Sequence, residues 1–128
     1  MSLGDPTTAL KGILDAIPGA EPVPVPVPHG RPTPALMYKV MGKIFAILSI
    51  RGQPFVVLRC EEFLAEIMRE QYSGVGRRSH LDPRRWISVD LDADVPPEEI
   101  ERLVGRSYDL ICAGLTRKQK AELAALTA

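Results

Sequence analysis

The segment from Tyr72 to Leu91 holds the densest set of side chains that could do chemistry. It contains four arginines, one histidine and the only tryptophan of the chain, namely Arg77, Arg78, Arg84, Arg85, His80 and Trp86. Guanidinium groups fork onto phosphate oxygens, and an indole ring stacks on an exposed base. The segment therefore predicts a nucleic-acid-binding site. The structural alternatives are arginines that are solvated or paired with acids, a tryptophan packed in or beside the core, and a histidine that pins its own loop by hydrogen bonds.

Four more basic residues fall on or between predicted strands: Lys39, Lys43, Arg51 and Arg59. Lys43 and Arg51 stand at the tips of predicted hairpins, from which they can lie along a nucleic-acid backbone. With the six residues above, they complete the predicted nucleic-acid-binding set. Weak DNA binding through this set predicts that most of its cations share one face, and that affinity falls steeply as salt rises.

The 16 basic and 16 acidic residues cancel, but they are unevenly distributed. Residues 31–85 include ten Lys or Arg and five Asp or Glu, whereas residues 90–101 include six acids and no base. A chain without net charge has no global field that attracts nucleic acid. Any attraction must come from the basic middle of the chain. The alternative is a mosaic surface whose clusters arise by chance.

The sequence offers little support for catalysis, metal binding or membrane insertion. It has no glycine-rich phosphate loop and no Gly-x-Ser-x-Gly, and its one candidate catalytic pairing is His80 with Asp82 or Asp90. Cys60 and Cys112 are widely spaced within apolar patterns, which predicts buried thiols in a reducing compartment rather than zinc ligands. No secretory signal is visible, and no apolar stretch approaches the about 20 residues of a membrane span. We expect a soluble, cytoplasmic, non-enzymatic monomer without metal or cofactor.

The first third of the chain predicts a helix and then a proline-rich connector. Thr7 or Thr8 is expected to cap the helix, and a Pro-Gly turn is expected to end it. The connector, residues 21–35, begins with alternating prolines that forbid a helix. It is predicted to be extended, as a polyproline-like spacer or a sheet edge, although it could also serve as a ligand for an aromatic-lined groove.

Alternation with a period of two follows from residue 36 to residue 58 and predicts a three-stranded antiparallel meander. Its first turn is expected at Met41-Gly42, where glycine can take a positive φ, and its second at residues 51–53. Residues 86–91 predict a later strand, and one or two strands are expected after the middle helix. We expect one α+β domain over the whole chain, with the first six residues disordered.

Residues 60–72 predict an amphipathic helix between the meander and the later strand. Its core-facing side chains are expected to be Phe63, Leu64, Ile67, Met68 and Tyr72. Its water-facing side chains are expected to be Glu61, Glu62, Glu66, Arg69 and Glu70. Asp94 and two prolines precede a third helix with acids in its first turn, and Thr116 is expected to cap a last one.

Several motifs occur in a fixed order along the chain. Tyr72 is followed by glycines and then by His-Leu-Asp-x-x-x-Trp-x-x-Val-x-Leu, from His80 to Leu91. The other pieces are Ile17-Pro18-Gly19, Pro28-His29-Gly30, Tyr38 to Ala46 with Gly42-Lys43 at a hairpin tip, Leu58-x-Cys60, Ser107-Tyr108-x-Leu110 and Leu115-Thr-x-Lys118. This order resembles the MmcQ/YjbR family of small bacterial proteins. The resemblance covers nearly the whole chain, from about residue 10 to residue 123.

The resemblance implies a fold and a role, with two departures. It implies a YjbR-like, secretion-chaperone-like sheet with an N-terminal, a middle and C-terminal helices, and DNA binding through two β "wings". The alternative is a non-catalytic protein-interaction module, in which the Val-Pro arm or a free sheet edge adds a partner strand. Relatives often carry Asn-Lys-x-His-Trp where this chain has Asp82 to Trp86, so no role that needs two histidines is implied. The Val-Pro repeat replaces a usually acidic linker.

Overall fold

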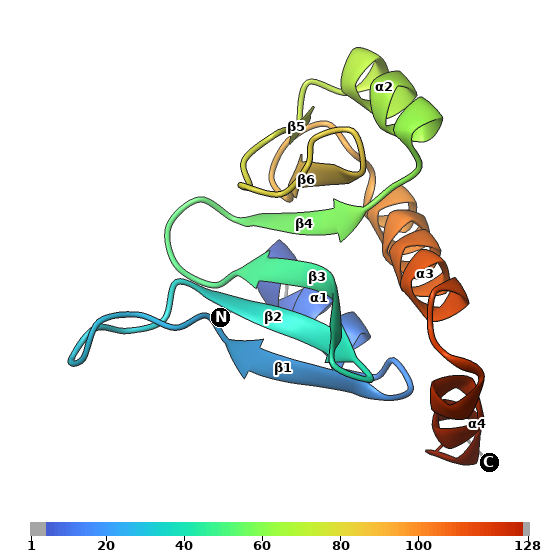
Figure 1. Cartoon of the computed structure of the whole chain (residues 1–128). Coiled ribbons are helices and arrows are strands. Elements are labelled where there is room, and N and C mark those ends of the chain that lie inside the picture. The colour runs from blue at the N-terminus through green and yellow to red at the C-terminus, as the bar shows by residue number, and fades with distance from the viewer. Residues whose placement is uncertain (1–4, 127–128) are drawn as a thin grey trace.

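The computed structural model describes residues 5–126, which form one six-stranded antiparallel sheet and four helices (Figure 1). The strands are β1 (Ala20–Pro24), β2 (Ala35–Val40), β3 (Lys43–Ser49), β4 (Phe55–Arg59), β5 (Val75–Gly76) and β6 (Trp86–Asp90). The helices are α1 (Pro6–Asp15), α2 (Glu62–Gln71), α3 (Pro97–Ala113) and α4 (Arg117–Leu126). The order across the sheet is β1-β2-β3-β4-β6-β5. The predicted α+β class is confirmed: β2, β3 and β4 are the meander, and β5 and β6 are the later strands.

Helices cover one face of the sheet. Leu14 of α1 and Val104 of α3 are fully or almost fully buried, and they belong to one core with Tyr38, Phe45 and Leu58 of the strands. Figure 1 shows α1 behind the sheet, while the opposite face carries no helix within residues 5–126. We call this opposite side the open face. By strand register its residues include Glu21, Val23, Met37, Lys39, Ile44, Ile47, Phe55, Val57, Arg59, Trp86, Ser88 and Asp90. Val57 and Ser88 are each only 1% exposed, so this face is not solvent-accessible throughout.

A β-bulge sends one aromatic side chain into the core. The register of β2 and β3 shifts between Tyr38 and Lys39, which leaves Phe45 as the extra residue of β3. Phe45 is fully buried and meets Tyr108 of α3 edge to face, with ring centroids 5.3 Å apart. As a consequence Ile44 pairs with Lys39, and both lie on the open face.

The edge strand β1 is built from the proline repeat. Val25 N donates to Ala35 O at 3.0 Å, so residues of odd number in this segment point their backbone groups toward β2. Pro22 and Pro24 then fall at the positions whose amide groups would face outward. Because proline has no N–H, the outer edge lacks donors at these two positions. The sequence expectation of an extended edge segment holds here.

The first helix begins earlier than expected. Asp5, rather than Thr7 or Thr8, is its N-cap: Asp5 Oδ1 accepts from Thr7 N at 3.0 Å, and Pro6 fills the first helical position, where no donor is needed. The predicted caps are therefore wrong. Of the six residues expected to be disordered, residues 1–4 lie outside the described part of the chain, and the other two begin α1.

The hairpin between β2 and β3 forms as predicted. Met41 and Gly42 take φ values of 48° and 83°, the paired positive values of a two-residue hairpin turn. Gly19 also has a positive φ, 77°, and a Cβ there would lie 2.5 Å from Leu123 Cδ1 of α4. The Pro-Gly turn after α1 is thus the surface on which α4 packs.

Helix α2 turns its apolar residues differently from the prediction. Phe63 is 76% exposed and Ile67 36% exposed, whereas Ala65 and Met68 are buried. The reason is position, since α2 packs near the short β5 at the edge of the sheet and has only a small surface to bury against. Assignment of Phe63 and Ile67 to the core is therefore wrong.

The last two helices start as the sequence suggests, with one difference. Thr116 and Gln119 exchange hydrogen bonds of 3.0 and 3.1 Å between backbone N–H groups and side-chain oxygens, so Thr116 caps α4. At α3 the cap is Pro96, and Asp94 instead accepts from the backbone of Ser73 and Gly74. No helix within residues 5–126 is both long enough and apolar enough to cross a bilayer.

Candidate nucleic-acid interface

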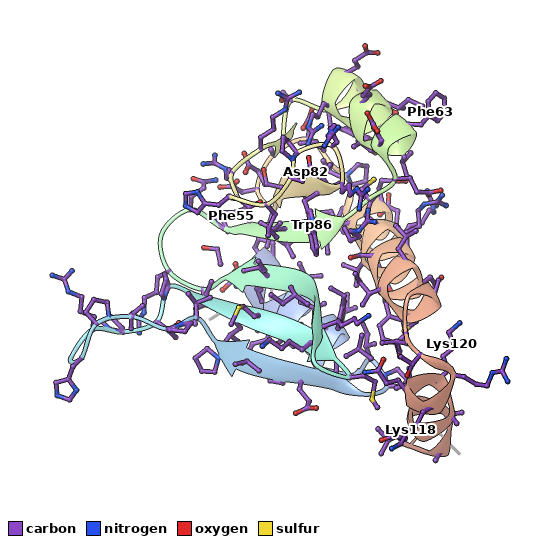
Figure 2. The ribbon with its side chains drawn as sticks, in the orientation of Figure 1. Phe55, Phe63, Asp82, Trp86, Lys118 and Lys120 are labelled. Atoms are coloured by element: carbon purple, nitrogen blue, oxygen red, sulfur yellow. The ribbon has the colours of Figure 1, made fainter. Side chains whose placement is uncertain are left out.

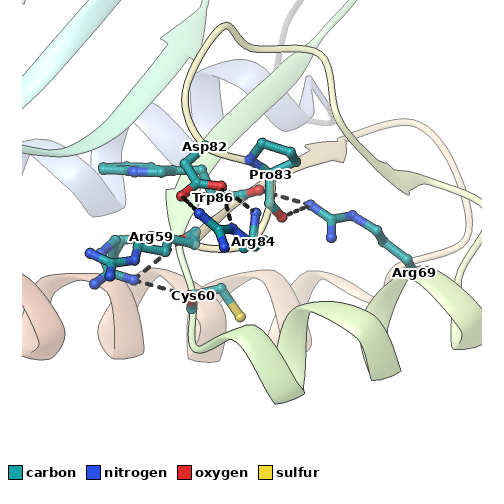
Figure 3. Close-up of polar contacts among 8 residues, drawn as sticks. Arg59, Cys60, Arg69, Asp82, Pro83, Arg84 and Trp86 are labelled. Atoms are coloured by element: carbon teal, nitrogen blue, oxygen red, sulfur yellow. Dashed lines mark hydrogen bonds and ion pairs between the residues drawn. The ribbon is translucent and has the colours of Figure 1, made fainter.

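Arg59 and Trp86 lie directly opposite each other on the open face. Cys60 N donates to Arg85 O at 2.7 Å, so the adjacent pair Arg59–Trp86 is a non-hydrogen-bonded pair of the β4–β6 ladder. Side chains in such pairs stand closer together than in hydrogen-bonded pairs. Both side chains are half-buried, which leaves part of the indole and part of the guanidinium exposed to solvent. A cation and an aromatic ring are therefore neighbours on the open face (Figure 3).

The guanidinium of Arg59 is only partly used by the protein. One terminal nitrogen donates to the carbonyl oxygens of Cys60 and Arg85, at 3.1 and 3.4 Å. Within residues 5–126 its Nε–H and its other terminal nitrogen have no hydrogen-bond partner, and no carboxylate lies within ion-pair distance. Because a guanidinium has five donors, most of them remain available to a ligand.

Two polar anchors fix the loop that leads into Trp86. Asp82 begins a turn: its carboxylate accepts from Arg84 N at 2.9 Å, and its carbonyl accepts from Arg85 N and Trp86 N. These bonds from Arg84, first the backbone and then the side chain, lower the pKa of Asp82. Arg69 of α2 is the second anchor and donates to Pro83 O at 2.6 Å and Trp86 O at 2.9 Å (Figure 3).

Lys39 lies on the same end of the open face, two strands from Arg59. Ile44 separates the two cations on β3, and Glu21 lies opposite Lys39 on β1. Lys39 makes no ion pair with any described residue, Glu21 included. Beside this polar row the centre of the face is apolar, with Val23, Met37, Ile47 and Val57 in register across four strands.

The other end of the open face is neutralised internally. Arg78 pairs with Asp90 at 2.9 Å, and its guanidinium carbon lies 5.5 Å from the centre of the Phe55 ring. Phe55 and Asp90 are themselves directly opposite each other on β4 and β6. The side chain of Arg78 is therefore committed to the protein's own carboxylate and aromatic ring.

The remaining predicted residues lie elsewhere. Lys43 points to the helical side and donates to Gly114 O at 3.1 Å, and Arg51, at the opposite end of β3, donates to Thr33 O at 3.1 Å. Arg77 and Arg84 line a cleft of about 150 Å³ beside α2, together with Glu62, Glu66, Arg69 and Pro83. Arg84 is paired with Asp82. The ten predicted residues thus do not form a single basic face.

Two exposed loop residues have side chains without a described partner. The side chains of His80 and Arg85 make no hydrogen bond or ion pair within residues 5–126. His80 therefore does not pin its loop as the sequence suggested. Asp82 is bonded to Arg84 and Asp90 to Arg78, so neither proposed catalytic pair with His80 is joined by a hydrogen bond.

The cysteines and acids provide no evident reactive centre. Cys60 is buried and Cys112 half-buried; both are free thiols, and burial is the main cause that raises the pKa of each. Among residues 5–126 no group of three or more His, Cys, Asp or Glu side chains is arranged to hold a metal ion.

Two residues that support the site were missed by the sequence. Arg69 was assigned to the solvent side of its helix, but it is half-buried and holds the loop before Trp86. Ser107 of α3 was noted only as part of a family motif and not as a support of the site, although its hydroxyl accepts from Arg59 N at 2.9 Å. A serine at a core-facing position of an amphipathic helix was the available signal, because a buried hydroxyl needs a partner.

The fold and the open face define a small α+β protein with an antiparallel sheet that helices back on one side only. The chain belongs to the YjbR family, whose model matches residues 16–110. The resemblance seen in the sequence is thereby confirmed.

The relatives in this family differ in how far they match. The chain is 36% identical over 75 residues to uncharacterized protein YjbR of Escherichia coli K12, and the match covers 58% of this chain and 64% of that protein. The chain thus spans less than two thirds of that relative's length. The crystal structure of Deinococcus radiodurans protein DR2400, with a DUF419 domain, has a TM-score of 0.78 at 24% identity, covering 95% of this chain and 92% of the other. A Pseudomonas syringae protein has a TM-score of 0.61 at 19% identity, covering 78% and 96%. At these identities the two structures show the fold alone.

Proposed function

We propose that this protein is a non-catalytic nucleic-acid-binding protein that uses the open face of its sheet. The observation that carries the proposal is the half-buried Arg59–Trp86 pair on the open face, with Lys39 at the same end. Arginine and lysine supply the charge that a phosphate backbone requires, and the indole supplies a stacking surface. DNA is the ligand class that the family resemblance suggests.

The number of available cations limits the strength of binding. Lys39 and Arg59 make no ion pair with any residue that the structure describes, whereas Arg78 and Arg84 are paired with acids. Only a few phosphates can be neutralised by so small a set, and the net charge of the chain is zero. We therefore expect weak binding that is strongest at low salt.

The test is a fluorescence-anisotropy titration of labelled oligonucleotides at about 50 mM and about 200 mM salt. Lys39→Gln and Arg59→Gln should each weaken binding at the lower salt concentration. Lys120→Gln on α4 is the matched control, because it removes one exposed positive charge that projects away from the sheet (Figure 2). The proposal is wrong if no oligonucleotide binds at low salt, or if all three variants bind as the parent does.

The two predicted hairpin contacts are expected to contribute less. Lys43 and Arg51 each donate to a backbone carbonyl of the protein, at opposite ends of the sheet. To bind a phosphate, the side chain of Lys43 or Arg51 would first have to break its hydrogen bond to the backbone carbonyl. Lys43→Gln should consequently weaken binding less than Arg59→Gln in the same titration.

A second function, protein interaction, is favoured by one observation on α2. Phe63 is 76% exposed, and the exposed Glu62 and Glu66 flank it. This surface fits a partner with an apolar pocket and a basic rim. Strand addition at β1 is disfavoured by its outward prolines. If a purified partner binds, Phe63→Ala should abolish binding while Lys39→Gln leaves it intact; equal binding by parent and Phe63→Ala would exclude α2 as the docking surface.

A further inference from the structure

We infer that the open face takes single-stranded nucleic acid, with an unpaired base stacked on Trp86 and backbone phosphates on Arg59 and Lys39. The inference rests on the proposed function and names the ligand class of the same site. It separates single strands from duplexes, which the family resemblance does not do.

The position of Trp86 is the first reason. Its ring belongs to a half-buried row on the sheet, at the first residue of β6, rather than to a protruding tip. In a duplex the π-faces of the bases are stacked inside the helix, and only their edges are presented in the grooves. A side chain in the floor of a sheet cannot reach between stacked bases, whereas an unpaired base can lie on it.

The groups that could enter a duplex groove are the second reason. The two hairpin tips carry Lys43 and Arg51, and both side chains are turned back to carbonyl oxygens of the protein. The donors at the two hairpin tips are therefore committed to the protein itself, whereas Arg59 keeps free donors on the sheet. This distribution of donors suits a nucleic-acid single strand that crosses the open face.

The spacing of the site fits a short single strand. Lys39, Ile44, Arg59 and Trp86 lie on four adjacent strands, so the row is about 14 Å wide at the usual strand separation. At about 3.4 Å per stacked nucleotide, this width corresponds to roughly four nucleotides. The half-buried apolar residues beside the row, Met37 and Ile47, offer further contact area to bases or sugars.

Most of the acidic side chains near the row from Lys39 to Trp86 have their negative charge neutralised by an ion pair. Asp90 pairs with Arg78, and Asp82 pairs with Arg84. Glu21, opposite Lys39, is the carboxylate on this side without an ion pair among the described residues. A phosphate near Arg59 is three strands away from Glu21, so this acid weakens only the outer end of the site.

Trp86 is its own reporter because the chain contains one tryptophan. We would titrate the protein with unlabelled oligothymidylate and oligouridylate of about 12 nucleotides, and with a duplex of the same length. Stacking of a base on the indole should quench its emission with the single strands more than with the duplex. The two single strands differ at the 2′-hydroxyl, so their relative affinities identify whether DNA or RNA is preferred.

The contribution of each side chain to the binding free energy is then measured with variants, by titrating labelled oligonucleotides with each variant protein. Trp86→Leu should weaken single-strand binding about tenfold and leave the salt slope unchanged, because stacking does not release counterions. Lys39→Gln and Arg59→Gln should each reduce the slope by about 0.7. The side chain of Lys39 makes no hydrogen bond or ion pair within residues 5–126, so its variant tests the inference even if Arg59→Gln perturbs the fold.

Each outcome has one meaning. Preferential binding of single strands that depends on Trp86 supports the inference. Duplex binding that is equal or tighter overturns it and leaves the proposed function standing. No binding at low salt overturns both. If the protein instead forms a dimer that Trp86→Leu dissociates, the open face is an interface with a second copy, and the inference is wrong.

Discussion

Ser107 joins β3 to β4 at the place where Arg59 enters the site. Its hydroxyl accepts from Arg59 N at 2.9 Å and donates to Phe45 O at 2.5 Å, so α3 supplies a bridge where a direct ladder bond would otherwise form. Ser107 is fully buried. This one side chain links the helical side of the molecule to the end of the open face that carries Arg59 and Trp86.

Replacing Ser107 by alanine should lower the free energy of unfolding by about 1–3 kcal/mol, because a buried N–H and a buried C=O lose their partner. Urea unfolding followed by circular dichroism measures the effect. Ser73→Ala is the matched control: Ser73 is exposed, and its hydroxyl makes one bond of 3.2 Å to Asp94. Equal stability of the parent and Ser107→Ala would show that the bridge is not needed.

The sequence predicted the elements well where local patterns determine them. The hairpin at Met41-Gly42 and the cap at Thr116 depend on neighbours in the chain, and both formed as expected. The pairing of Arg59 with Trp86 depends on the register of two strands that are 27 residues apart along the chain, which no local pattern specifies. The direction of Phe45 likewise depends on a bulge.

Exposure on α2 was the clearest failure, because periodicity shows that a helix has an apolar side but not how much surface the fold provides for it. Met68 is buried in the structure, whereas Phe63 is exposed to solvent. The ten residues predicted to bind nucleic acid are not brought together on one face of the structure. Lys43 and Arg78 carry the positive charge that was expected, but each side chain binds a group of the protein itself. Lys43 donates to Gly114 O, and Arg78 pairs with Asp90.

Phe63→Gln should change the free energy of unfolding by less than about 0.5 kcal/mol, because the side chain is already in water. Met68→Ala, five residues along the same helix, should cost about 2–5 kcal/mol. Thermal or urea unfolding of the two variants checks the contrast. A large loss with Phe63→Gln would mean that this side chain is buried in solution, by the protein itself or by a second copy.

Replacing Pro22 and Pro24 together by threonine should promote self-association, because it restores two outward N–H groups on the edge strand. Light scattering and thioflavin fluorescence during prolonged incubation measure the effect. Pro32→Thr is the control, since Pro32 is exposed and lies outside any strand. If the double variant stays as soluble as the parent and the control, the prolines do not protect the edge.

Asp94 should make stability depend on pH. Backbone N–H groups of Gly74 and Ser73 donate to its carboxylate at 2.8 Å each, and they lower its pKa below the ordinary 3.8. A lowered folded-state pKa means that the stabilisation is complete above the unfolded-state pKa and is lost as pH falls through the folded-state pKa. Asp94→Ala should thus destabilise the protein more at neutral pH than in strong acid. Urea unfolding at both pH values tests this, and a loss that does not change with pH would contradict it.

Binding of nucleic acid to the open face would be measured by a two-dimensional NMR titration of isotope-labelled protein. A short single strand and a duplex would be added separately, at low and moderate salt. If the open face binds, we expect salt-sensitive shifts at the backbone amides of Lys39, Arg59 and Trp86 and at the Trp86 indole N–H, with α3 and α4 unchanged. Shifts confined to the helices or the hairpin tips, or no shifts at low salt, would contradict it.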